Sequence, residues 1–197
     1  ERKSMKNNKN KPKLIVLNGS PGVGKSTLSK RYIDNHPMTL NIDIDHIWWM
    51  MGQWQAARPA SESQKFKLAN AMLKTHLNEG YDVIIAQHIA TLEYHRELEQ
   101  IVEACDATLI EITLFCEEND AIQRCVDRGK KAGYKTGFRP GGILESEGGR
   151  EKLRLMYQEM IDGAKIRKNM HYVSSVYGAE DDTYTRLLAI VDEVPVN

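Results

Sequence analysis

The sequence predicts an α/β fold in three layers, a central parallel sheet of about five strands with helices on both of its faces. Two features of the chain point to this fold. Short runs rich in apolar and β-branched residues alternate with longer amphipathic stretches, as they do when helices connect parallel strands. The first run, residues 14–17, leads into a glycine-rich turn that matches G-x-x-x-x-G-K-[ST]. A strand, a tight turn and a helix are therefore expected in immediate succession.

Local signals set the boundaries of the elements in the first half of the chain. A helix is expected from Lys25 to about Asn35, because Pro37 disfavours helical backbone in the residue before it. A long helix is expected to begin at Ser61, where Gln64 would complete a capping box. The expected elements of this half are strands over 14–17, 39–43 and 83–87 and helices over 25–35, 44–53 and 61–80.

The second half continues the alternation. The longest β-rich run, residues 108–115, is expected to be a central strand. A later helix keeps six apolar residues at helical spacing, which indicates core positions: Leu153, Met156, Tyr157, Met160, Ile161 and Ala164. The other expected elements are helices over 92–104, 118–128 and 181–191 and a short strand over 171–174.

Residues 129–149 interrupt this rhythm. They hold seven of the chain's 14 glycines and four basic residues, Lys130, Lys131, Lys135 and Arg139. Long irregular segments inside a compact domain are either floppy connections or functional lids. A Gly-rich lid that closes over phosphates needs this freedom and this charge, so we expect one here.

Composition limits the possible classes of protein. The 197 residues, 41% hydrophobic and 27% charged, suit one domain, expected over 13–197, while the basic residues 1–12 are expected to form a disordered tail. Basic and acidic residues are equal at 27 each, which disfavours nucleic acid as a partner. The sequence gives no indication of an oligomeric state.

Cysteine usage and hydropathy predict the compartment. Cys105, Cys116 and Cys125 are odd in number and lack C-x-x-C spacing, which favours reduced thiols over disulfides or a zinc site. The chain lacks an apolar run of roughly 20 residues that could span a membrane. We therefore expect a cytoplasmic protein without membrane association.

The glycine-rich turn is a phosphate-binding loop by its chemistry. Its glycines let successive backbone N–H groups face phosphate oxygens, at the positive end of the following helix. Lys25 would reach the β- and γ-phosphates of ATP, and the Ser26 hydroxyl would bind Mg²⁺. The residues expected to bind the nucleotide are Gly19, Ser20, Pro21, Gly22, Val23, Gly24, Lys25, Ser26 and Thr27.

Two aspartates, Asp43 and Asp45, follow the second expected strand. Ligands bind at the carboxyl ends of strands in open α/β sheets, so these carboxylates are candidate site residues. One could support Mg²⁺ and the other could accept the proton of an attacking hydroxyl. The alternative is that they cap the next helix, which accounts well for one of them but not for both.

These motifs together resemble the small P-loop kinases, the group of shikimate kinase, gluconate kinase and chloramphenicol phosphotransferase. The resemblance runs from about Lys13 to Val191 and implies the three-layer P-loop NTPase fold with ATP and Mg²⁺ as cofactors. By the same resemblance, Asp43 would support Mg²⁺, and Asp45 would contact the acceptor and act as the base. Arg124 and Arg128 match the lid arginines of the family, which stack on adenine or clamp the phosphoryl group; the alternative is a solvated helix face.

The chain departs from many members of that group at its third strand. Relatives often end this strand with an aspartate that supports the metal, whereas Gln87 and His88 stand here. Mg²⁺ would then depend on Ser26, Asp43 and water. Gln87 and His88 would face the acceptor, or His88 is an ordinary hydrogen-bonded histidine.

The acceptor region is expected over residues 44–80. All three tryptophans, Trp48, Trp49 and Trp54, fall within seven residues there, and helical spacing cannot bury all of them on one face. We expect part of this cluster to line a pocket for a flat or partly apolar acceptor, and the rest to pack as core. Arg58 would bind an anionic group or be exposed.

Three functions remain compatible with the sequence. The first is a kinase that transfers the γ-phosphoryl group of ATP to a hydroxyl of a small molecule, with Lys25, Asp45 and Arg128 as catalytic residues. The second is a kinase of a larger acceptor, such as a polynucleotide end, or of the sugar nucleotide that zeta-type toxins phosphorylate. The third is an ATP-binding switch without catalysis.

Overall fold

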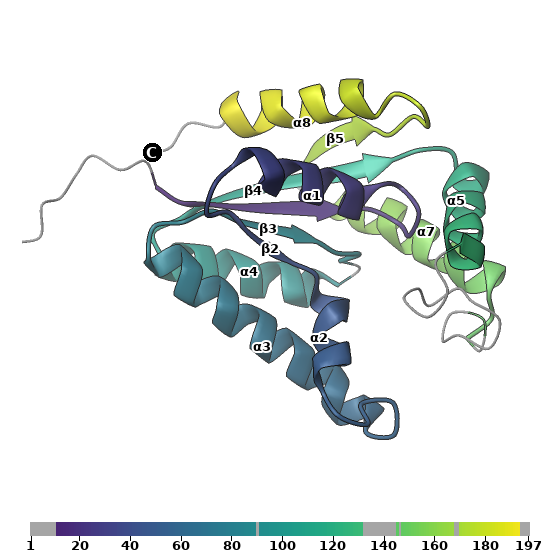
Figure 1. The fold of residues 1–197 in the computed structure, drawn as a ribbon, viewed down its shortest axis with the longest axis horizontal. Coiled ribbons are helices and arrows are strands. Elements are labelled where there is room, and N and C mark those ends of the chain that lie inside the picture. The colour runs from purple at the N-terminus through teal and green to yellow at the C-terminus, as the bar shows by residue number, and fades with distance from the viewer. Residues whose placement is uncertain (1–10, 90, 132–144, 146, 168–169, 194–197) are drawn as a thin grey trace, which may run out of the picture.

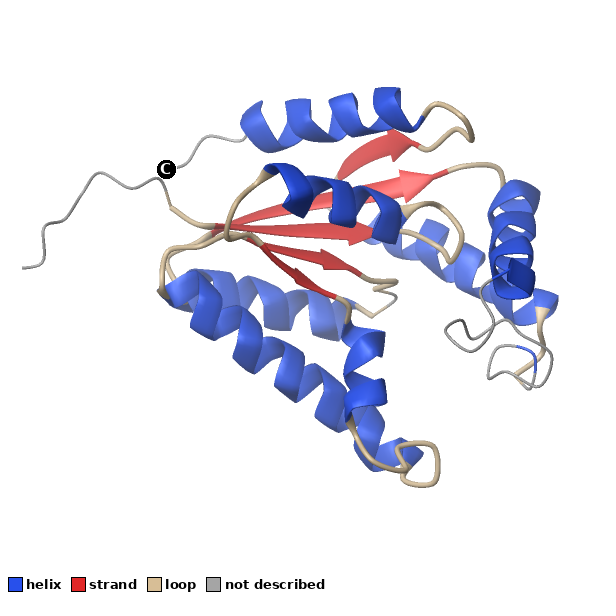
Figure 2. Ribbon diagram, in the orientation of Figure 1, coloured by secondary structure: helices blue, strands red, loops and turns tan. Residues whose placement is uncertain are grey.

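The fold is a five-stranded sheet with helices on both faces (Figure 1, Figure 2). The computed structural model describes residues 11–89, 91–131, 145, 147–167 and 170–193. All strand pairs are parallel, and the strand order is β2-β3-β1-β4-β5. The strands are β1 (Lys13–Asn18), β2 (Leu40–Ile42), β3 (Val83–Ala86), β4 (Thr108–Phe115) and β5 (His171–Ser174). The predicted α/β fold class is confirmed.

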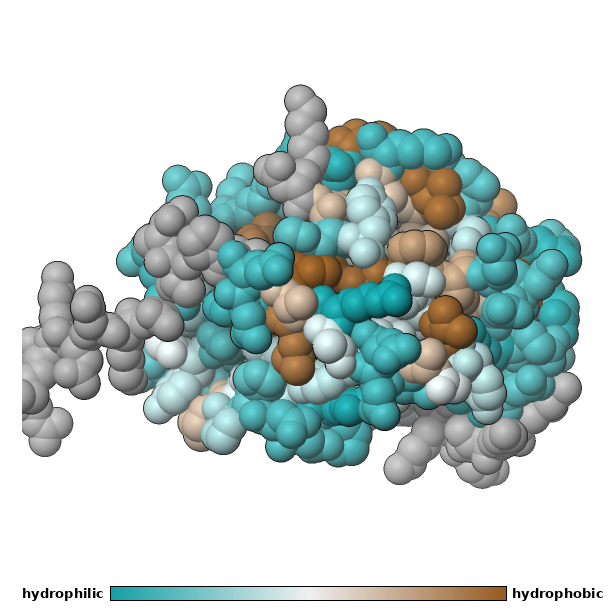
Figure 3. Space-filling view, turned by 90° about the horizontal axis from the view of Figure 1, so that it is seen from above, coloured by the Kyte–Doolittle hydropathy of each residue, from teal (hydrophilic) through white to brown (hydrophobic). Residues whose placement is uncertain are grey.

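Helices occupy the connections between the strands. They are α1 (Lys25–Asn35), α2 (Ile44–Met50), α3 (Arg58–Asn78), α4 (Leu92–Ala104), α5 (Glu118–Lys131), α7 (Arg150–Ile166) and α8 (Glu180–Glu193). Side chains of α3 and α4 join the core on one face of the sheet, and side chains of α1 and α8 join the core on the other. Seen from the side of α8, the surface is largely hydrophilic, with scattered apolar side chains (Figure 3).

The central strand β1 explains why its sequence is apolar throughout. Leu14 and Val16 lie in the core beneath α3 and α4, whereas Ile15 and Leu17 lie in the core beneath α1 and α8. All four side chains are fully buried. A strand covered on both faces has no solvent-facing positions, so it lacks the polar alternation of a half-exposed strand.

The structure corrects two helix boundaries. The long helix begins at Arg58 and not at Ser61, with Pro59 in its first turn, where the missing N–H of proline costs nothing. Ser61 is instead buried, and its hydroxyl donates to the carbonyl oxygens of Trp54 and Arg58. The helix expected over 44–53 ends at Met50, where the chain turns toward α3.

Most of the expected lid at 129–149 lies outside the described residues. Of its amino-terminal part, the structure places residues 129–131 in the last turn of α5. In the described parts of the chain, no helix has the length and apolar character needed to cross a membrane.

Because all five strands are parallel, their carboxyl ends share one edge of the sheet. The phosphate loop follows β1, Asp43 follows β2, Gln87 follows β3, and Ser175 follows β5. The fold therefore brings residues that are far apart in sequence to a single edge.

Candidate active site

Three glycines of the phosphate loop have positive φ values, and two of them show why glycine is needed there. Gly22 has a φ of 91°, and a Cβ atom there would stand 2.0 Å from the carbonyl oxygen of Ala121 in α5. Gly24, with a φ of 97°, adopts the left-handed conformation directly before α1. A side chain at either position would strain the backbone, and at Gly22 it would also push α5 away.

Lys25 is the first residue of α1 and folds back over the loop. Its ammonium group donates to the carbonyl oxygens of Gly19 at 2.8 Å and Ser20 at 2.9 Å. Burial, and next the positive charge of Arg128, lower the pKa of Lys25 to about 8. Asp45 and Asp43 oppose this shift, so their carboxylates also lie within electrostatic reach of the ammonium.

The loop fits a bound polyphosphate. Lys25 and Arg128 bring two positive charges close together, which is the arrangement that an anion between them would stabilise. The hydroxyl of Ser20 is buried and lacks a hydrogen-bond partner among the described residues. The next hydroxyl side chains, Ser26 and Thr27, are exposed at the start of α1 and can reach a ligand.

The sequence predicts only two protein ligands for Mg²⁺, Ser26 and Asp43. Within the described ranges, no group of three or more His, Cys, Asp or Glu side chains could hold a metal ion. Such a sparse donor set fits Mg²⁺, which retains waters and takes phosphate oxygens as ligands.

Asp43 caps α2. Its Oδ1 accepts from the backbone N–H groups of Asp45 at 3.1 Å and His46 at 3.3 Å, and its Oδ2 lies 2.9 Å from His46 Nδ1. Of the two aspartates, Asp43 is therefore the one that the capping alternative explains. Its partners leave it able to act on a metal ion through water.

Asp45 has a different environment. Its Oδ1 lies 2.9 Å from the ammonium nitrogen of Lys65, and its side chain remains 55% exposed. Lys65 comes from α3 and is only 4% exposed. Asp45 is therefore accessible to a ligand, and the buried ammonium group of Lys65 contacts one of its two carboxylate oxygens.

The three tryptophans divide as expected between surface and interior. Trp54 is buried and stacks on Trp48, with ring centroids 4.8 Å apart and an interplanar angle of 11°. Trp49 is 53% exposed and meets the edge of Trp54. Trp48 and Trp49 can contact an acceptor, whereas Trp54 supports them from beneath.

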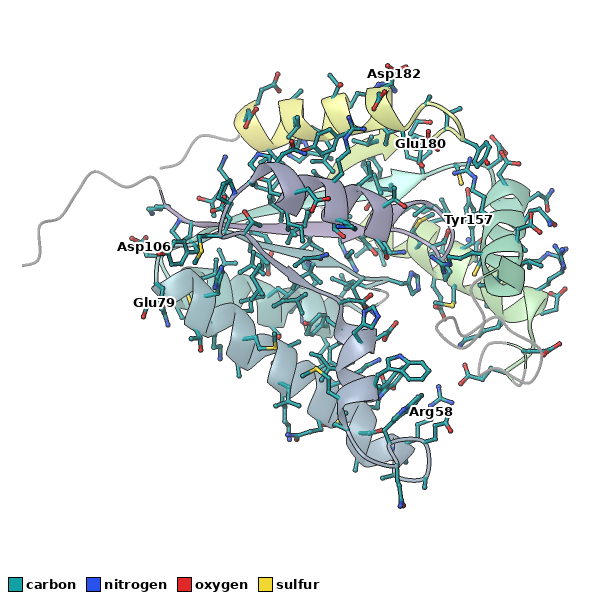
Figure 4. The ribbon with its side chains drawn as sticks, in the orientation of Figure 1. Arg58, Glu79, Asp106, Tyr157, Glu180 and Asp182 are labelled. Atoms are coloured by element: carbon teal, nitrogen blue, oxygen red, sulfur yellow. The ribbon has the colours of Figure 1, made fainter. Side chains whose placement is uncertain are left out.

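Arg58 lies at the start of α3, on the side of that helix that faces α5 and α7 (Figure 4). It pairs with Glu147, which precedes α7, and its guanidinium carbon stands 5.9 Å from the Trp48 ring centroid. The ion pair joins the acceptor region to the carboxyl-terminal end of the expected lid.

His88 lies inside the site, and the Gln87 backbone joins the sheet. The backbone N–H of Gln87 donates to Leu17. His88 Nε2 lies 3.4 Å from Glu159, and His88 Nδ1 is buried without a partner among the described residues. Burial, and next the charge of Lys25, lower the pKa of His88, and this favours the neutral imidazole.

Arg124 and Arg128 have different neighbours. The Arg124 guanidinium lies 3.4 Å from the carbonyl oxygen of Ser175 and 5.7 Å from the ring of Tyr177. Arg128 is exposed, its Nη2 atom lies 3.9 Å from Cys125 Sγ, and its charge lowers the pKa of Lys25. One arginine thus stands at the loop after β5, and the other stands near the phosphate loop.

Comparison with protein families identifies the group. A family model described as "AAA domain" matches residues 14–137, more than half of the chain. The chain belongs to the AAA domain family. This match covers the phosphate loop, both aspartates and both arginines of α5.

Relatives of this AAA domain chain are kinases. An adenylate kinase of Deinococcus radiodurans is 27% identical over 192 residues, which cover 91% of this chain and 96% of that protein. An L-seryl-tRNA(Sec) kinase of Methanococcus maripaludis is 29% identical over 126 residues, which cover 60% of this chain and 47% of that protein. The chain thus spans about half the length of the second relative. The resemblance to small P-loop kinases is confirmed.

A solved structure gives the same picture of the fold. The gluconokinase from Sinorhizobium meliloti superposes with a TM-score of 0.57 at 15% identity, covering 93% of this chain and 97% of that one. Identity this low supports the shared fold alone.

Three site residues of this AAA domain chain are absent from the predictions made from its sequence. Asn18 accepts from the N–H groups of Gly19 and Ile89 and ties the phosphate loop to the loop after β3. Tyr177, 80% exposed, stands beside Arg124. Asn18 is the last residue of β1 and Tyr177 lies in the loop after β5, so their places at the carboxyl ends of strands could have indicated them. Lys65 carried no such signal.

Proposed function

We propose that this protein transfers the γ-phosphoryl group of ATP to a hydroxyl of a small molecule, such as a sugar, a nucleoside or an antibiotic. One observation carries the proposal. Asp45 is a half-exposed carboxylate within electrostatic reach of Lys25, because its charge opposes the lowering of the pKa of that lysine. A proton acceptor therefore stands beside the place where the loop would hold the phosphates.

The reaction needs one proton transfer at a defined atom. The acceptor hydroxyl gives its proton to Asp45, and its oxygen bonds to the γ-phosphorus. The bond between that phosphorus and the bridging β–γ oxygen breaks, and ADP leaves. Lys25 and Arg128 stabilise the negative charge that builds on the phosphoryl oxygens.

Mg²⁺, held by Ser26 and through water by Asp43, would supply charge neutralisation at the phosphates when bound. The neutral His88 imidazole adds no positive charge to this part of the site. It can accept or donate a hydrogen bond to the acceptor or to water.

A hydroxyl acceptor fits the site better than a phosphate acceptor such as adenylate. Asp45 would repel a phosphate and has no proton to remove from one. Two cations of the acceptor region, Lys65 and Arg58, are already paired with carboxylates. This distinguishes the proposed reaction from the one that the name of the adenylate kinase relative gives.

A second candidate is a kinase that phosphorylates a hydroxyl attached to RNA. The L-seryl-tRNA(Sec) kinase relative favours it. The equal numbers of basic and acidic residues oppose it, because RNA binding needs a basic surface.

The test is ADP release in the presence of hydroxylated compounds. Sugars, nucleosides, hydroxylated antibiotics and a tRNA pool are screened for ADP formation above the background of ATP hydrolysis. With a responding acceptor, Lys25→Ala should abolish transfer, and Asp45→Asn should lower it by about 10²-fold or more while ATP affinity stays at the parental value. Full transfer by Asp45→Asn would overturn the assignment of the base.

A further inference from the structure

Lys65 is a charged residue that is buried in the protein interior. Its side chain is 4% exposed, whereas the other two lysines of the same helix α3, Lys67 and Lys74, are exposed to solvent. Lysine is rarely buried without a compensating partner, because transferring an ammonium group out of water is unfavourable. The protein must therefore stabilise this charge locally.

Three contacts supply that stabilisation. The ammonium nitrogen lies 2.9 Å from Asp45 Oδ1 and 3.0 Å from Glu62 Oε1. It also stands 3.3 Å from the centroid of the Trp48 ring, whose electron-rich face attracts a cation. Two carboxylates and the Trp48 ring thus surround the charge closely, and the Phe66 ring centroid lies 5.1 Å from it.

The same contacts hold the acceptor region together. Asp45 and Trp48 come from α2, and Lys65 and Glu62 come from α3. Trp48 is supported by the stacked ring of Trp54. Lys65 is therefore held in a defined position relative to α2, and its contact with Oδ1 restrains the Asp45 carboxylate.

We propose that Lys65 is the positioning residue of the catalytic base Asp45. It binds Oδ1 and so fixes the orientation of the carboxylate, which leaves Oδ2 directed to the acceptor hydroxyl. This inference rests on the proposed function, because it assigns a partner to the base of that reaction.

The experiment compares substitutions on one helix in the full chain. Lys65→Gln removes the charge but keeps a polar group of similar length, and Lys67→Gln, at an exposed position of the same helix, is the matched control. With the acceptor found by the ADP-release screen, Lys65→Gln should lower kcat by roughly 10- to 100-fold and leave the KM for ATP within about twofold. Lys65→Arg should restore part of the loss, and Lys67→Gln should behave as the parent.

A double substitution tests whether Lys65 acts through Asp45. If it does, Asp45→Asn combined with Lys65→Gln should be no slower than Asp45→Asn alone, because the base is already lost. Multiplied losses would show that the two residues act independently and would overturn the inference.

Glu62→Gln separates positioning from simple packing. It removes one partner of Lys65 but leaves the pair with Asp45, so kcat should stay within about threefold of the parent. An equal loss of kcat in Glu62→Gln and Lys65→Gln, with ATP affinity intact in both, would mean that the loss comes from disturbed packing around Lys65 and not from its contact with Asp45. Glu62→Gln leaves Lys65 in place, so its own expected result, a kcat within about threefold of the parent, can be measured even if Lys65→Gln folds poorly.

The proposed base and the proposed role of Lys65 are contradicted by different results. Full transfer by Asp45→Asn contradicts the proposed base itself. Loss of transfer in Asp45→Asn together with full transfer in Lys65→Gln contradicts only the role of Lys65.

Discussion

The surroundings of Lys25 lower the pKa of its ammonium group toward neutral pH, and this makes nucleotide binding depend on pH. Its pKa in the nucleotide-free protein is lowered to about 8 by burial and by Arg128. Bound phosphates would raise that pKa again, because negative charge favours the protonated form. Above pH 8, ATP binding must therefore take up a proton.

We expect the Lys25 ammonium to leave ATP affinity nearly constant from pH 6.5 to 7.5. Above pH 8, its deprotonation should lower the affinity by up to roughly tenfold per pH unit. Calorimetric titration in two buffers of different ionisation enthalpy measures both the affinity and the proton uptake. Lys30→Ala, at an exposed position of α1 paired with Asp34, serves as the control and should keep the dependence. Equal affinities at pH 7 and pH 9.5 in the parent would contradict the prediction.

Gly22 is the residue of the phosphate loop that tolerates a side chain least. Its positive φ alone costs a non-glycine residue about 1–2 kcal/mol. The contact with Ala121 adds to that cost, because the obstacle is backbone and cannot rotate away. Gly22→Ala should therefore lower the melting temperature and weaken ATP binding.

Gly52→Ala is the control for this substitution. Gly52 lies in a loop with open space around the position of a Cβ atom. Its substitution should change the free energy of unfolding by no more than about 0.5 kcal/mol. Thermal unfolding followed by circular dichroism compares the two variants, and equal melting temperatures would show that the loop can move away from α5.

Single residues show how far sequence reasoning reaches. The phosphate loop was predictable because its spacing has few other uses. The burial of Lys65 was not, because Glu62 and Lys65 at i and i+3 form the same pattern as an exposed ion pair on a helix surface. Only the packing of α2 against α3 places that lysine in the interior, and packing between elements leaves no local signature.

The α2–α3 turn shows the same limit for an element. Serine followed three residues later by glutamine matched a capping box, yet Pro59 allowed the helix to begin one turn earlier, at Arg58. By contrast, the helix over 92–104 and the strands over 108–115 and 171–174 have the predicted bounds. Clear breaks in hydrophobic pattern define those three.

The buried hydroxyl of Ser61 links the start of α3 to the α2–α3 turn, so a substitution of Ser61 should destabilise this turn. The hydroxyl donates to the carbonyl oxygen of Trp54 at 2.9 Å. Ser61→Ala would leave that carbonyl without this partner and should lower the free energy of unfolding by about 1–3 kcal/mol. Because all three tryptophans lie in this region, their fluorescence emission should shift to longer wavelength as Trp54 becomes more hydrated.

Ser63→Ala is the matched control, since Ser63 is exposed two residues further along the same helix. It should change neither the emission maximum nor the denaturant midpoint. An unchanged midpoint in Ser61→Ala would mean that water replaces the hydroxyl at no cost.

For the molecule as a whole, the site exists because the sheet is parallel. Its order places β1 between β3 and β4, so the phosphate loop has the loops of both neighbours on its flanks. The alternation of elements in the sequence predicted a parallel sheet but did not give the order of its strands. The contact of Arg124 with the loop after β5 therefore had to come from the structure.

This arrangement predicts that nucleotide binding stabilises the entire domain. A ligand at 100 times its Kd adds about 2.7 kcal/mol to the free energy of unfolding. For a domain of this size, that corresponds to a rise in melting temperature of about 5–10 °C. A non-hydrolysable ATP analogue with Mg²⁺ should produce this rise in the parent, measured by differential scanning calorimetry. At the same ligand concentration Lys25→Ala should show little of it, since the lysine charge at the phosphates is gone.

Substitutions of Tyr177 test where the nucleobase of the nucleotide binds. If the base lies against Tyr177 and Arg124, Tyr177→Ala should reduce the rise with the ATP analogue but not the rise with inorganic tripolyphosphate, which has no base. Tyr177→Phe keeps the ring and should behave as the parent. A full rise in Lys25→Ala would contradict the nucleotide site, whereas a full rise in Tyr177→Ala would place the base elsewhere along the same edge of the sheet.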